Sequence, residues 1–137
     1  MWALRTMAIT TPAIFGLVQD RVYVNEIPLS IVRAEDTRRP RKMLVLRQAG
    51  GGGKADLMPV FNYTIDALAY GEDDLEANKL LLAVTERFIT LSRETHNNVL
   101  IHHLNTTGGP IPSVEPDLVW PVIAQSFTTL ADVLEVA

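Results

Sequence analysis

The chain has 137 residues, of which 47% are hydrophobic and 20% are charged, and its formal net charge is −4. This composition is typical of a globular protein and excludes a chain that stays disordered for lack of hydrophobic residues. Because there is no cysteine, disulfides, thiolate zinc sites, iron–sulfur clusters and thiol nucleophiles are also excluded. The length predicts a single domain over residues 1–137.

Charge is distributed unevenly along the chain. Residues 1–54 contain nine Lys and Arg against four Asp and Glu, whereas residues 55–137 contain three against twelve. The two halves can offset each other within one fold, or they can form unlike patches that meet on neighbouring copies in a head-to-tail ring. The basic run Arg38-Arg39-Pro40-Arg41-Lys42 is short and has no interleaved aromatic residues. We therefore expect no sequence-specific nucleic-acid binding.

The segment Met1–Val18 is rich in apolar residues, but Arg5 and the sequence Thr10-Thr11-Pro12 interrupt it. This pattern differs from that of a signal peptide, and no apolar run approaches membrane-spanning length. We expect a soluble, intracellular protein without membrane contact.

Short helices and strands are predicted in the first half of the chain. Residues 2–9 predict a short helix, and residues 13–18 predict a second short turn. Branched and aromatic residues predict a strand over 21–27. The nearly continuous apolar run 42–47 is typical of a central strand that is covered on both faces.

Two connections in this half have unusual composition. A long polar segment joins Ser30 to Pro40 and contains Arg33, Arg38 and Arg39. Four consecutive glycines have no side chains to bury and a high ordering cost, so they predict a flexible loop at a hairpin tip. These glycines are Gly50, Gly51, Gly52 and Gly53.

The second half contains the strongest helix signal. Asp73 can cap the first free amides, and Glu76 completes a sequence like a capping box. A stripe of apolar residues at spacings of four and three follows, which predicts one buried helix face. The stripe consists of Ala77, Leu81, Val84, Phe88 and Leu91, and it is broadened by Leu80 and Ile89. We expect the helix to end near Thr95.

Strand patterns lie on both sides of this helix. Alternating polarity over 61–67 predicts a half-exposed strand, with Ile65 and Ala67 on its apolar face. Residues 99–104 predict another strand, Thr107–Pro110 a turn, and 118–129 a last strand. Pro121 suggests that the last strand lies at an edge or contains a bulge.

The predicted fold class is α+β. We expect a mixed, mainly antiparallel sheet of four to five strands, with one long helix and a short N-terminal helix packed on it.

No motif in the sequence predicts catalysis. The stretch from Gly50 to Lys54 lacks the residues of a phosphate-binding loop at both ends. His102 and His103 are adjacent in a predicted strand, so they would point to opposite faces and could not easily share a metal. The acidic residues 72–76 are explained by helix capping. We expect a protein that is not an enzyme and that uses no cofactor and no metal.

Four stretches, in order, carry a family resemblance over most of residues 13–130. They are Asp20-Arg21-Val22-Tyr23 with Pro28, Pro40-Arg41-Lys42-Met43-Leu44-Val45-Leu46 before the glycines, Tyr63-Thr64-Ile65-Asp66 before Tyr70-Gly71, and Glu76-Ala77 with Leu80-Leu81 and Val84. Together they resemble the tail terminator or tail completion proteins of long-tailed bacteriophages, the lambda-type tail-closing family.

This resemblance implies a structural protein of the virion, located at the head-proximal end of the tail and assembled in the host cytoplasm. It implies a homo-oligomer, a hexameric ring, that caps the tail tube protein and joins it to the head–tail connector or neck protein. Long loops are costly to retain without a role. The candidate ring contacts are therefore Arg33, Arg38, Arg39, Arg41, Gly50, Gly51, Gly52 and Gly53.

Two alternatives stay open at the level of sequence. A neck or head-completion connector subunit would share the size and the ring symmetry. A small-molecule-binding or catalytic α+β domain could hold a site that no linear motif reveals.

Overall fold

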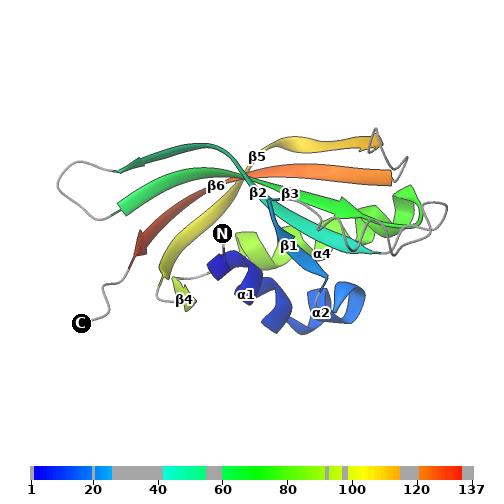
Figure 1. Cartoon of the computed structure of the whole chain (residues 1–137), viewed down its shortest axis with the longest axis horizontal. Coiled ribbons are helices and arrows are strands. Elements are labelled where there is room, and N and C mark those ends of the chain that lie inside the picture. The colour runs from blue at the N-terminus through cyan, green and yellow to red at the C-terminus, as the bar shows by residue number, and fades with distance from the viewer. Residues whose placement is uncertain are drawn as a thin grey trace.

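The computed structural model describes residues 2–19, 21–25, 42–54, 60–91, 93–96, 99–114 and 121–133 (Figure 1). These residues form an α+β fold in which helices pack against one face of a mixed, mainly antiparallel sheet. The predicted fold class is therefore confirmed, and the differences concern the number, length and order of the elements.

The described strands form one sheet in the order β1-β2-β3-β6-β5-β4. Their bounds are β1 Val22–Val24, β2 Met43–Lys54, β3 Val60–Tyr70, β4 Glu94–His96, β5 Val99–Val114 and β6 Pro121–Val133. The pair β1 and β2 is parallel, and the other pairs are antiparallel. The sheet has six strands rather than the predicted four to five. The strand that the prediction missed is β4, whose three residues are too few to show a period.

The described helices are α1 Trp2–Thr10, α2 Pro12–Val18 and α4 Asp74–Ile89. The short N-terminal helix is confirmed, and the predicted turn after it is a second helix with Pro12 in its first turn, where proline is tolerated. The prediction that the long helix reaches Thr95 is wrong. The helix ends at Ile89, and the following chain includes Arg93 at a φ of 43° before it enters β4.

The start of α4 is capped as its sequence predicts. The Asp73 carboxylate accepts a hydrogen bond from the Glu76 amide at 2.8 Å, and the Glu76 carboxylate accepts one from the Glu72 amide at 3.1 Å. Both carboxylates lie at the positive end of the helix dipole. Local chemistry therefore determines where this helix begins.

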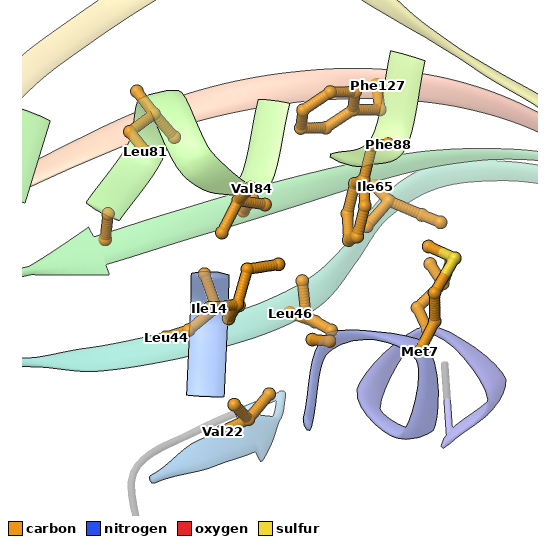
Figure 2. Packing of buried hydrophobic residues seen from close by; sticks show 14 of the residues in the cluster. Met7, Ile14, Val22, Leu44, Leu46, Ile65, Leu81, Val84, Phe88 and Phe127 are labelled. Carbon is orange, nitrogen blue, oxygen red and sulfur yellow. The ribbon is translucent and has the colours of Figure 1, made fainter. Parts of the chain in front are cut away.

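The main hydrophobic core lies between the helices and the sheet (Figure 2). The residues of the predicted stripe are all buried, including Leu91 just beyond the end of α4, and so is Leu80. The Phe88 ring meets the Phe127 ring of β6 edge to face, with centroids 5.2 Å apart and an interplanar angle of 67°. Figure 2 shows Ile65 of β3 beside this pair, and Leu44 and Leu46 of β2 along the same face. Helix and sheet are thus joined by aliphatic packing around one aromatic pair.

A second buried cluster lies on the opposite face of the sheet. It consists of Met43, Val45, Tyr70 and Val122, with Tyr23 and Leu68 packed against it. Because Leu44 and Leu46 belong to the main core, alternate residues of β2 are buried on opposite faces. The prediction of a strand covered on both faces is confirmed for Met43–Leu46, whereas Arg47 is exposed.

Two predictions about the last strands are wrong. Thr107–Pro110 is part of β5 rather than a turn between strands. The strand β6 pairs with both β3 and β5, so it lies in the interior of the sheet rather than at an edge. Pro121 is compatible with this position because it is the first residue of β6, where proline is accepted in sheets.

Candidate assembly surface

The predicted ring contacts fall into two groups. Arg33, Arg38, Arg39 and Arg41 lie outside the described residues. The four glycines lie within β2, where Gly50, Gly51 and Gly53 pair with β3 and Gly52 falls at a register shift. The prediction of a flexible loop at these glycines is therefore wrong. The glycines do make the pairing irregular. The register between β2 and β3 shifts between Gln48 and Gly50 and again between Gly51 and Gly53.

The two sides of the sheet carry unlike edges. β1 pairs with β2 only from Leu44 to Leu46, so the rest of β2 has a described neighbour only on its β3 side. On the other side, β4 pairs with β5 only from Val99 to Ile101, and the rest of β5 has a described neighbour only in β6. In Figure 1 the end of β2 (dark teal) and the end of β5 (yellow) extend toward opposite ends of the long axis. Among the described residues, each side of the sheet thus leaves a long strand edge open.

The β5 edge is interrupted by a bulge. Thr107 pairs with Ser126 and Ile111 with Ala124, so the residues from Gly108 to Pro110 lie opposite Gln125 alone. The Gln125 side chain is buried and donates hydrogen bonds to the carbonyls of Gly108, at 3.0 Å, and Ser126, at 3.1 Å. Prolines and bulges limit the addition of a further strand. A second register shift lies between Ile101 and His103, so the regular part of this open edge extends from His103 to Thr107.

A row of polar side chains crosses the sheet on the face opposite the helices. Arg47, Asp66 and Ser126 are in register on β2, β3 and β6. The Ser126 hydroxyl donates to Asp66 at 2.6 Å, and an Arg47 nitrogen lies 3.5 Å from the other oxygen of that carboxylate. A nucleophilic serine is activated by a neighbouring base. Since the Asp66 carboxylate is already paired with Arg47, we interpret the row as a cross-strand ladder that aligns the strands.

An ion-pair network attaches β4 to the helices. The Arg87 guanidinium donates two hydrogen bonds to the Glu94 carboxylate, one of them 2.8 Å long, and a third to the Thr11 hydroxyl at 3.0 Å. Thr11 donates in turn to the Met7 carbonyl at 2.8 Å. The Nε2 atom of His96 lies 3.3 Å from the Glu94 carboxylate. The network fixes the position of β4 and thereby determines where the open edge of β5 begins.

The hydrogen bonds from Arg87 hold the pKa of Glu94 below its ordinary value, with a smaller contribution from His96 and against the opposing effect of burial. The same interaction raises the pKa of Arg87. A carboxylate whose pKa is lowered in the folded state stabilises the fold above its ordinary pKa. This stabilisation is lost as the pH falls through the lowered value, because the folded state must then bind a proton.

We expect Glu94→Gln to lower the free energy of unfolding by about 1 kcal/mol at neutral pH, because the pair is bidentate but partly exposed. Urea unfolding of both proteins between neutral pH and about pH 3 measures this effect. The difference between them should shrink as the wild-type carboxylate becomes protonated. A difference that stays constant over this range would show that the charge of Glu94 does not stabilise the fold.

The described residues contain no group of three or more His, Asp or Glu side chains placed to hold a metal ion. His102 lies at a register shift in β5, between Ile101 and His103. His103 is exposed, and its Nδ1 atom lies 3.3 Å from the side-chain amide nitrogen of Asn105. Within the same described ranges, no helix has the length and apolar character needed to cross a membrane.

Sequence reasoning missed the open strand edges, because they depend on which strands pair and over what length. The one local signal was the pair of prolines at Pro110 and Pro112, which is typical of an edge strand. Comparison with models of protein families and with curated proteins finds no match to this chain.

Proposed function

We propose that this protein is a structural ring subunit of a long phage tail, a tail terminator that caps the tail tube and joins it to the head connector. The proposal originates in the resemblance of the four sequence stretches described above. The structural observation that supports it best is the presence of two unlike open edges at opposite sides of the described sheet.

Open strand edges expose backbone N–H and C=O groups and attract other strands. A head-to-tail contact joins one edge of each subunit to the other edge of the next, and such contacts continue until the rotation closes a ring. In a closed ring every subunit has both edges covered. This geometry uses the two edges that have no neighbouring strand among the described residues, the end of β2 and the regular part of β5.

The charge distribution supports the same arrangement. The basic N-terminal part and the acidic C-terminal part can face each other across a head-to-tail contact. Individual exposed ion pairs are weak and screened by salt. Ring formation should therefore weaken as ionic strength rises, even though backbone pairing does not depend on salt.

We expect the triple reversal of Arg38, Arg39 and Arg41 to Glu to leave folding intact and to reduce ring formation or capping of tail tubes. The reason is that it replaces three positive charges in the basic half with three negative ones. Electron microscopy of the purified protein with tail tubes, and mass measurements over a range of concentration and salt, test this prediction. A matched control is Arg93→Glu, which reverses an exposed charge outside the basic run.

The outcomes separate the parts of the proposal. Normal capping by the triple variant would remove the basic segment from the interface and leave the ring assignment intact. Binding to head connectors but not to tubes would identify a neck subunit instead. If the unmutated protein forms no rings and binds no tube ends at any concentration, the tail-terminator assignment is wrong.

A further inference from the structure

The outer face of α4 carries three large aliphatic side chains at intervals of seven residues. Leu75 and Leu82 are each 61% exposed, and Ile89 is 50% exposed. Since seven residues complete almost two turns, the three side chains lie along one line of the helix. Ile89 was expected to broaden the buried stripe, but it belongs to this exposed line. We refer to Leu75, Leu82 and Ile89 as the outer stripe.

Exposed single leucines are common on protein surfaces and need no explanation. The outer stripe differs because it extends over nearly the whole of α4 and lies on the side opposite the buried stripe. A line of aliphatic side chains with a seven-residue period is the pattern by which helices pair along their length. The stripe is therefore a surface suited to another helix.

The charged residues beside the outer stripe indicate which helix would bind there. Lys79 and Glu86 are both exposed and lie on the same flank of the stripe, again seven residues apart. If two copies of α4 pair antiparallel about a twofold axis at Leu82, Leu75 meets Ile89 of the second copy. On the flank, Lys79 then meets Glu86 of the second copy, and Glu86 meets its Lys79. The surface is thus complementary to itself, as a twofold contact requires.

The equal number of positive and negative charges beside the outer stripe does not favour binding to a membrane. Helices that lie on membranes carry an excess of Lys and Arg beside their apolar face. Here one lysine is matched by one glutamate, and the opposite flank contains the uncharged Asn78 and Thr85.

We propose that the outer stripe of α4 is a self-association surface, through which two copies of this chain form an antiparallel helix-to-helix dimer. A contact made by one helix from each copy is smaller than the interfaces of stable dimers, which bury about 1,200–2,000 Å² in total. The dimer should therefore be reversible and should form as concentration rises. The proposal is independent of the ring assignment, because α4 packs on the face of the sheet whereas the ring contacts proposed above lie at its edges.

The test is the molecular mass in solution, measured by sedimentation equilibrium from about 1 µM to about 1 mM. We expect the wild-type mass to rise from that of one 15.2 kDa chain toward that of two. Leu82→Glu should form no dimer over the same range, because it places two negative charges side by side at the centre of the contact. The matched control is Ile111→Glu, which changes a side chain on β5 that is 67% exposed and should dimerise like the wild type.

Charge exchange tests the antiparallel arrangement itself. Lys79→Glu and Glu86→Lys should each weaken the dimer about three- to tenfold, because each replaces two symmetry-related attractive pairs with repulsive ones. The double variant that carries both changes should recover wild-type dimerisation. Residues seven apart on one helix are not neighbours, so this recovery would not arise within a single chain.

Three results would overturn the inference. The first is a wild-type protein that stays monomeric at every concentration. The second is a dimer that Leu82→Glu leaves unchanged, and the third is a double charge variant that does not recover dimerisation. Rings that persist in Leu82→Glu would support the tail-terminator proposal and show that the outer stripe is not the ring contact; they would leave the dimer proposal to the three results above.

Discussion

Replacing Phe88 with alanine is expected to lower the free energy of unfolding by about 3–5 kcal/mol. The Phe88 ring is fully buried between α4 and the sheet, and its partner Phe127 is equally buried. Removing the ring loses the edge-to-face contact and leaves a cavity in the centre of the main core. Helix and strands on both sides constrain the backbone, so we expect the cavity to collapse only partly.

Denaturant unfolding in dilute solution measures this effect, with Ile89→Ala as the matched control. Ile89 is the next residue on the same helix, and it is half exposed. We expect the control to cost less than about 1 kcal/mol. Similar losses for the two variants would show that α4 does not pack on the sheet through its predicted face.

Replacing Gly71 with alanine is expected to lower the free energy of unfolding by about 1–3 kcal/mol. Gly71 is buried between the end of β3 and the start of α4. A Cβ atom at this position would lie 2.5 Å from the Ala77 amide nitrogen and 3.0 Å from the Glu76 carbonyl carbon. Both are backbone atoms of the first turn of α4. Because the Asp73 cap holds this turn, either the strand or the helix must shift.

Gly16→Ala is the control for this substitution. Gly16 lies within α2, and no atom lies within 4 Å of a Cβ added there. Alanine favours a helix over glycine, so this variant should be as stable as the wild type or more stable, by up to about 1 kcal/mol. If Gly71→Ala unfolds like Gly16→Ala, the close approach of α4 to the end of β3 is not part of the folded protein.

Two surfaces of this protein are now assigned separate roles by proposal. The open edges of β2 and β5 suit contacts that continue around a ring, whereas the outer stripe of α4 suits a contact that closes after two copies. Under the two proposals, Leu82→Glu removes the dimer contact and the triple arginine reversal weakens the ring contact. Their effects on mass should therefore add without influencing each other, provided that the two contacts form independently.

Elements whose signals are local can be predicted without the structure. The cap at Asp73 and the spacing of Leu81, Val84 and Phe88 predict both the start of α4 and the face that it buries. The apolar run 42–47 predicts a strand covered on both faces, which Met43 and Leu44 confirm from opposite sides. Hydrogen bonds to the first turn and a period of 3.6 residues involve only neighbours in the chain, so they can be read without a partner.

The tertiary structure alone decided which strands are neighbours. Gly50–Gly53 has the composition of a loop, but β3 supplies pairing partners for three of the four glycines, and pairing overrides the weak preference of glycine. Pro121 suggested an edge, yet β6 lies between β3 and β5 because proline at a first position leaves the rest of the strand free to pair. The strand edges left open among the described residues follow from the length over which strands far apart in the sequence pair, and no local pattern encodes that length.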